Sequence, residues 1–232
     1  VNFKYDANAT AKTKEALAAL IITAINSYSS TQLEKFESVF RYSVVTTLID
    51  EADPAILNNI STIKMSKTFK PTLNDALKYT ISFSNALFHP HGGNMASTTG
   101  TTPGGILSSS GFTITGDANT YYVEDDGAGL VNAYYISGTS KVYMTTGSVG
   151  TIDYLTGDVV FTKISIATVG DVDGASSNYI RLTVQPSSND IVPVRNQILQ
   201  IDAVNLSVTG TADTIAAGAG DAGVNYTTTS SY

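Results

Sequence analysis

The sequence contains no cysteine and no tryptophan, and it is poor in positive charge. Without cysteine, the chain can form no disulfide, no thiolate nucleophile and no zinc–thiolate site. Only 13 Lys and Arg residues stand against 20 Asp and Glu residues, which gives a net charge of −7. A nucleic-acid binder gathers basic residues on one face to neutralise phosphates, and no segment here does so. We therefore expect no nucleic-acid partner.

Long apolar runs are also missing. The longest, Ala16 to Ile22, has seven residues, whereas a membrane-spanning helix needs about 20. No basic segment followed by an apolar stretch marks a signal peptide, and we expect no membrane partner. The chain begins at Val1 rather than at a methionine, so we expect a fragment of a longer polypeptide.

Threonine, serine, glycine and tyrosine are abundant instead, with 31, 24, 19 and 13 residues respectively. This composition suits a β-rich, loop-rich extracellular or virion protein better than a metabolic enzyme. A chain of 232 residues fits one large domain or two small ones. Because no disulfide can form, its stability must come from packing, sheet hydrogen bonds or assembly with other chains.

The N-terminal part combines both secondary-structure periods. Residues 1–7 alternate apolar and polar side chains, which predicts a half-buried strand. Apolar residues then recur at helical spacing, which predicts helices over 10–28 and 31–50. Alternation returns in 59–71 and 77–87 and predicts two further strands. The order β-α-α-β-β is that of a small α+β unit in which two helices cover one face of an antiparallel sheet.

The C-terminal part contains short alternating segments separated by glycine-containing turns. Such spacing predicts an all-β stack of hairpins. The turn at Thr156–Gly157 shows the pattern, because glycine tolerates the positive φ that a tight hairpin needs. We expect strands within these segments: 111–116, 120–129, 130–138, 141–147, 150–167 and 178–186, with a closing strand or strand pair within 196–210.

The predicted fold class is therefore α+β, an N-terminal β-α-α-β-β unit followed by a mainly antiparallel all-β domain. The expected segments are an α+β self-association unit at 1–88, a Ser/Thr/Gly-rich loop or linker at 89–110, an all-β domain at 111–208 and a flexible C-terminal tail at 209–232.

An acidic cluster follows the second predicted helix. Asp50, Glu51 and Asp53 could act as a paired acid and base or as ligands of a hard cation. The simpler interpretation is a solvated helix end, with Asp53 accepting from a backbone N–H near the following proline. Negative charge at a helix C-terminus is unfavourable, so a basic partner such as Arg41 or a neighbouring chain would help. We favour the structural interpretation.

Other candidate sites are weak. His89 and His91 could share a metal ion, but no further ligand lies near them in sequence, so a plain loop is favoured. Asp171 and Asp173 begin like a calcium loop, but Leu182 stands where that loop needs a glutamate. No nucleophile elbow or P-loop is present. We predict that the chain is not an enzyme and binds no cofactor or metal.

Four ordered segments carry a family resemblance: FRYSVVTTLIDEADPAILNNIS (40–61), TYYVEDDGAG (120–129), GTIDYLTGDVVF (150–161) and SSNDIVPVRNQILQID (187–202). Together they resemble the C-terminal part of the baseplate wedge protein of T-even-like contractile-tailed phages, a relative of the baseplate J-like proteins. The resemblance runs from about residue 1 to residue 208.

This resemblance implies a late virion structural protein of the tail baseplate, assembled in the host bacterial cytoplasm. In that family two copies pair through their C-terminal regions, and alternating contacts close a ring around the baseplate hub. The implied partners are a second copy of the chain and other wedge proteins. The family has no catalytic residues to carry over.

The helix predicted at 31–50 is the candidate interface, because it has apolar positions on more than one stripe. One face would pack on its own sheet and the other on a partner, unless another part of the same chain covers it. Arg195 could hold Asp190 or an acidic neighbour in a bidentate contact. The predicted interface residues are Phe36, Phe40, Arg41, Val44, Val45, Leu48, Asp50, Asp53 and Arg195.

A different class of function stays open, an adhesin or tail-fibre-like β module that binds host surface glycans. Four tyrosines, Tyr121, Tyr122, Tyr134 and Tyr135, could stack on sugars if they gathered in one open groove. Alternation along a strand would instead turn at least half of them into the core, which favours the structural interpretation.

Overall fold

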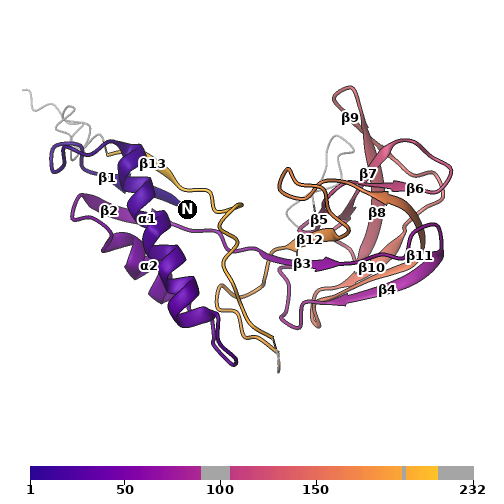
Figure 1. Cartoon of the computed structure of the whole chain (residues 1–232), viewed down its shortest axis with the longest axis horizontal. Coiled ribbons are helices and arrows are strands. Elements are labelled where there is room, and N and C mark those ends of the chain that lie inside the picture. The colour runs from indigo at the N-terminus through magenta and orange to yellow at the C-terminus, as the bar shows by residue number, and fades with distance from the viewer. Residues whose placement is uncertain (90–104, 195–196, 214–232) are drawn as a thin grey trace, which may run out of the picture. The chain divides into compact units, whose positions relative to one another are not determined.

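The computed structural model describes residues 1–89, 105–194 and 197–213. Residue contacts divide the chain into two units, shown in Figure 1. Unit 1 consists of Val1–Thr62 together with the described residues of Val192–Tyr232, and unit 2 of Ile63–Ile191. The chain therefore leaves unit 1, builds unit 2 and returns to unit 1.

Unit 1 contains both α-helices and one small sheet. Its elements are β1 (Asn2–Tyr5), α1 (Lys14–Tyr28), the π-helical turn η1 (Ser29–Leu33), α2 (Tyr42–Asp50), β2 (Ile56–Ile60) and β13 (Thr209–Ala212). The strand order is β13-β1-β2. Strand β2 runs antiparallel to β1, whereas β13 runs parallel to it. In β1, Phe3 is buried while Asn2 and Lys4 are exposed, so one face of the sheet is covered.

Helix α1 begins where the sequence places a cap. The Thr13 hydroxyl accepts from the N–H of Ala16 at 3.2 Å, which satisfies one of the free donors at the helix start. Four apolar side chains one turn apart face the core of the unit: Leu17, Ile21, Ile25 and Tyr28. Among the described residues, neither α-helix has the length and apolar character required to cross a lipid bilayer.

The helix predicted at 31–50 is only partly present. Helix α2 covers its second half, whereas residues 34–41 are not helical. Glu37 adopts a φ of 62°, which a right-handed helix cannot contain. Arg41 is extended at the N-cap of α2. The apolar spacing in 33–40 that suggested a helix comes from Leu33 and Phe40, which a turn directs into the core.

The strand predicted at 59–71 is two strands. Strand β2 ends at Ile60 in unit 1, and β3 (Met65–Phe69) belongs to a sheet of unit 2. The element order β-α-α-β-β is confirmed, because β2 and β3 follow α2, and β4 (Ala76–Ser82) comes next. Strands β3 and β4 nevertheless pair within unit 2, so the contacts change units after Thr62.

The closing segment also differs from the expectation. In the described part of 196–210, strand structure is confined to the start of β13 at Thr209. Strand β13 continues to Ala212, so these residues, which the sequence analysis assigned to a flexible tail, lie in a sheet. The rest of that tail, 214–232, is outside the described residues.

Unit 2 is built from antiparallel strands, as predicted. Its strands after β3 and β4 are β5 (Ser108–Ser109), β6 (Phe112–Ile114), β7 (Thr120–Asp125), β8 (Leu130–Ser137), β9 (Ser140–Tyr143), β10 (Gly150–Asp153), β11 (Asp158–Val169) and β12 (Ile180–Val184). A seven-stranded sheet follows the order β10-β11-β6-β7-β8-β9, with β4 on β11. Because β10 also pairs with β8, this sheet closes on itself. A second sheet has the order β3-β12-β5.

The predicted turn at Thr156–Gly157 is confirmed, and a second hairpin closes in the same way. Gly157 has a φ of 78° between β10 and β11, and the Asp153 carboxylate accepts from the N–H of Leu155 at 2.8 Å. Between β7 and β8, Gly127 has a φ of 73°. There the Asp126 carboxylate accepts from the N–H groups of the turn. Short polar side chains and glycine thus close both hairpins.

Candidate assembly surface

Helix α2 and the segment before it contain most of the predicted interface residues, and the structure divides them. Val45 lies on the buried face of α2 with Ile49. Phe40 is also buried, with its ring edge-on to Tyr28 at 6.4 Å between centroids. These two predicted contacts are therefore covered by the unit's own side chains and do not offer a surface to a partner. Some of the additional apolar residues of the predicted helix therefore pack inside unit 1.

We use the name α2 surface for the predicted residues on α2 and before it that are not buried: Phe36, Arg41, Val44, Leu48 and Asp50. Phe36 is 68% exposed and Val44 is 37% exposed, although both are apolar. Leu48 is half-buried. Arg41 and Asp50 supply one charge of each sign. Arg195, the last predicted interface residue, lies outside the described residues.

The acidic cluster after α2 is structural. Asp53 is buried and accepts from the Lys12 ammonium at 2.5 Å. Its other oxygen accepts from the N–H of Ala55 at 2.9 Å, the local contact predicted for this proline turn. The hydrogen bonds from Lys12 and then Ala55 hold the pKa of Asp53 below its usual value. The basic partner is Lys12 rather than Arg41.

Asp50 and Glu51 do not join Asp53 in a site. Asp50 accepts from the Asn59 amide at 2.8 Å, which ties α2 to β2. Both Asp50 and Glu51 are exposed. A shared proton or cation needs carboxylates that face each other, and these three side chains have separate environments. Lys12 was missed as the partner because it is 41 residues distant in sequence, and the helical pattern gives no signal for that contact.

His89 lies against an aromatic ring. Its imidazole stacks on Tyr154 with centroids 4.4 Å apart and planes 19° apart. The Tyr154 hydroxyl donates to the buried Asp125 carboxylate at 2.6 Å. The second carboxylate oxygen accepts from the N–H of Leu107 at 2.8 Å. Burial, followed by the Asp125 hydrogen bond, raises the pKa of Tyr154 above its ordinary value.

The two hydrogen bonds of Asp125 join three separate parts of unit 2, and each of its carboxylate oxygens has a donor. His91 lies outside the described residues. Across the described residues, no group of three or more His, Asp or Glu side chains is placed to hold a metal ion. The arrangement around Asp125 is that of a buried polar anchor.

The four tyrosines of the glycan hypothesis lie on two faces. Tyr121 is buried, and its hydroxyl donates to Asp117 at 2.6 Å, which raises its pKa to about 12. Tyr135 meets the Tyr121 ring edge-on at 5.5 Å. Tyr122 and Tyr134 lie on the other face, with centroids 5.9 Å apart.

That second face carries a cluster that the sequence analysis missed. Tyr143 lies 5.9 Å from Tyr134, which extends the row of rings across β7, β8 and β9. The Lys141 ammonium lies 4.4 Å above the Tyr134 ring. Glu124 accepts from both Lys141 and Tyr143. Cross-strand neighbours of this kind stabilise a sheet, and only the strand register brings them together.

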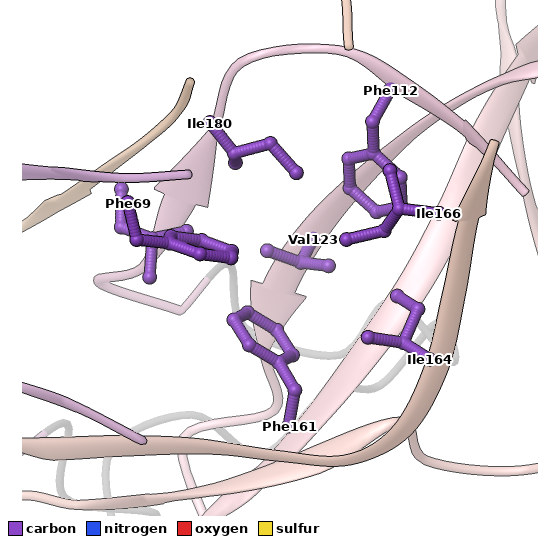
Figure 2. Close-up of a pocket in the computed structure, with 8 residues that line it drawn as sticks. Phe69, Phe112, Val123, Phe161, Ile164, Ile166 and Ile180 are labelled. Atoms are coloured by element: carbon purple, nitrogen blue, oxygen red, sulfur yellow. The ribbon is translucent and has the colours of Figure 1, made fainter. Parts of the chain in front are cut away.

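The core of unit 2 contains a small apolar void, shown in Figure 2. Its walls are Phe69, Phe112, Val123, Phe161, Ile164, Ile166, Ile180 and Leu182. The void is about the size of one water molecule and has no polar lining, so even a water would lack hydrogen-bond partners there. It is a packing defect rather than a ligand site.

Asp171 and Asp173, where the sequence analysis rejected a calcium loop, lie in the loop before β12. Asp173 adopts a φ of 57° in a tight turn. Its two carboxylate oxygens accept hydrogen bonds from the two terminal guanidinium nitrogens of Arg181. This bidentate ion pair fixes the loop before β12.

The comparison with known families concerns the segment that builds β1, α1, α2 and β2. Residues 1–68 match the family described as baseplate structural protein gp6, C-terminal domain III. Over these residues the chain is similar to that gp6 domain. The family resemblance predicted from the sequence is thereby confirmed for residues 1–68. The resemblance of the later motifs, within 120–202, stays a prediction. No curated protein matches the chain.

Proposed function

We propose that this chain is a structural subunit of the tail baseplate of a contractile-tailed phage, corresponding to the C-terminal part of a wedge protein. The observation that carries the proposal is the gp6 family match over residues 1–68, which contain both helices and two strands of unit 1. The role is mechanical: the chain contributes surfaces and stiffness and transforms no substrate. Its location is the virion tail, after assembly in the host cytoplasm.

We further propose that two copies pair through unit 1 and that repeated pairing contributes to a ring around the baseplate hub. The α2 surface supports this proposal, because it includes two exposed apolar side chains, Phe36 and Val44, and one charged side chain of each sign. Burial of apolar area would supply the binding energy. Arg41 and Asp50 would set the register of the pair, since exposed ion pairs add only about 0–1 kcal/mol each.

Sedimentation velocity of the chain over a wide concentration range tests the pairing. The wild type is expected to form a dimer as concentration rises. Phe36→Ser combined with Val44→Ser should weaken dimerisation about tenfold or more. Leu155→Ser is the matched control, because it removes an apolar side chain that is 82% exposed in unit 2. A wild type that stays monomeric at the highest concentration would contradict the pairing.

The baseplate assignment has its own test, independent of pairing. Neighbouring wedge proteins from the same phage, expressed with this chain, should form a complex that survives gel filtration. Antibodies against the chain should label the tail baseplate of intact virions in electron micrographs. Labelling of capsids alone would contradict the assignment, whatever the oligomeric state of the isolated chain.

A second candidate function, glycan binding by unit 2, is favoured by the row of Tyr122, Tyr134 and Tyr143 on one face of the sheet. Aromatic rings in a row can stack on the apolar faces of sugars. Glu124 and Lys141 bond each other and the tyrosines, which leaves fewer polar groups for a ligand. A glycan array with wild type and Tyr143→Ala discriminates: binding that the substitution removes would support this candidate.

A further inference from the structure

We infer that the baseplate family domain of this chain is discontinuous: it closes only when residues 197–213 return to it, and residues 63–191 form a separately folding insertion. The family match ends at residue 68. The sheet of unit 1, however, takes its third strand from residues 209–212, far beyond the match. The inference concerns how the domain is built and does not depend on pairing or ring formation.

Backbone hydrogen bonds fasten the returning segment along the whole of β1. Thr209 donates to the carbonyl of Val1 at 2.9 Å, and Asp213 donates to the carbonyl of Tyr5 at 2.8 Å. The amino terminus at Val1 also donates to the carbonyl of Ser207 at 2.8 Å. The returning segment therefore pairs with the first strand of the matched domain from one end to the other.

Side-chain packing shows the same dependence. A Cβ added to Gly210 would lie 2.5 Å from the Phe3 ring, so the backbone of β13 lies directly on that ring. Phe3 is only 1% exposed. At the start of η1, the hydroxyl of buried Ser29 accepts from the N–H of Ile201 at 3.0 Å. Without residues 201–213, the sheet would have two strands and Phe3 would lose the backbone that lies on its ring.

A two-stranded sheet is marginal in water, and a third strand or additional packing is needed for independent stability. Strand β13 is that third strand, and α1 packs against it. The match to residue 68 therefore covers a segment that does not by itself contain the complete sheet of this domain.

The segment between the two parts of unit 1 has the geometry of an insertion. Strand β3, near its start, pairs antiparallel with β12, near its end, so that Met65 lies opposite Val184 and Phe69 opposite Ile180. The two ends of unit 2 are thus adjacent, as in domains that insert into others without disturbing them. Unit 2 also has its own buried core around the closed sheet.

Unit-selective destabilisation of the full chain tests the inference. Both α-helices of the described residues lie in unit 1, so helical circular dichroism during heating reports on that unit. Gly210→Val should lower the melting temperature of the helical signal by roughly 5–15 °C. Leu182→Ala, at a fully buried site in unit 2, should leave that melting temperature unchanged and lower only the calorimetric transition of unit 2.

Thr211→Val is the matched control in the same strand, because the Thr211 side chain is exposed. If Gly210→Val prevents unit 1 from folding, the calorimetric transition of unit 2 should still persist. The decrease in the melting temperature of unit 1 is then measured with the smaller substitution Gly210→Ala. Two results would overturn the inference. One is a single transition that both Gly210→Val and Leu182→Ala lower together; the other is a helical signal that Gly210→Val leaves unchanged.

Discussion

Lys12 donates to Asp53 at 2.5 Å, joining the residue just before the capped start of α1 to the turn that follows α2. The lysine side chain is 51% exposed and the aspartate side chain 6% exposed, so one partner is solvated and the other is not. A carboxylate buried in this way depends on its hydrogen bonds, because a buried charge without partners is strongly unfavourable.

The first prediction concerns this carboxylate. Asp53→Asn should lower the free energy of unfolding of unit 1 by about 1–3 kcal/mol, because the charge-assisted bond to Lys12 is lost. Asp50→Asn is the control, since Asp50 is exposed and should change the stability by less than about 0.5 kcal/mol. Urea unfolding followed by helical circular dichroism measures both. Equal effects of the two substitutions would contradict a special role for Asp53.

The second prediction is the pH dependence of the same contact. The pKa of Asp53 is lowered in the folded chain from its ordinary value of 3.8. The contribution of Asp53 is therefore fully present above that value and is lost as the pH falls through the lower, folded pKa. The stability of unit 1 should decrease with acidification in this range, and less steeply in Asp53→Asn. Parallel slopes in the two proteins would show that other carboxylates dominate.

The third prediction concerns the buried anchor at Asp125. Tyr154→Phe removes the hydroxyl that donates to this carboxylate at 2.6 Å. Leaving a buried carboxylate oxygen without its donor should lower the stability of unit 2 by about 1–3 kcal/mol. Tyr179→Phe at a side chain that is 48% exposed serves as the control. Calorimetry of the full chain measures the transition of unit 2, and an unshifted transition in Tyr154→Phe would refute the prediction.

The fourth prediction compares two glycines with positive φ. At Gly157, φ is 78° and an added Cβ would lie 2.3 Å from the carbonyl oxygen of Asn85. At Gly138, φ is 62° and an added Cβ would have no neighbour within 4 Å. Both alanine substitutions carry backbone strain, but Gly157→Ala also forces the backbone apart. Gly157→Ala should destabilise unit 2 by about 1 kcal/mol or more beyond Gly138→Ala, measured by urea unfolding. Equal losses would show that the contact with Asn85 relaxes freely.

Local sequence patterns predicted the structure correctly where the deciding interactions lie within one helix, strand or turn. The stripe through Leu17, Ile21 and Ile25 predicted α1, and Thr13 caps it. Gly157 and Gly127 lie in hairpin turns and have the positive φ that such turns need. Strand alternation predicted that at least half of the four tyrosines would turn inward, and Tyr121 is buried. In each case the determining interaction lies within a few residues of the signal.

Local patterns failed where distant contacts decided the outcome. Phe40 has helical spacing from Phe36, yet it enters the core through a turn and Phe36 is exposed. The alternation across 59–71 continues through the point where the chain changes units. Nothing in the polar sequence of residues 209–212 predicts a strand, because β13 is stabilised by its parallel pairing with β1 rather than by apolar side chains of its own.

The sequence by itself determined the α+β class, the antiparallel character of the second unit, the positions of its turns and the gp6 resemblance of the first 68 residues. Those properties follow from side-chain period, backbone permissiveness and motif order, which are local in the chain. Only the tertiary structure decided that Asp53 belongs to Lys12, that Phe40 and Val45 are already covered, and that residues 209–212 complete the first sheet. These are contacts between residues far apart in sequence, and their energies depend on what the folded chain brings together rather than on any local pattern.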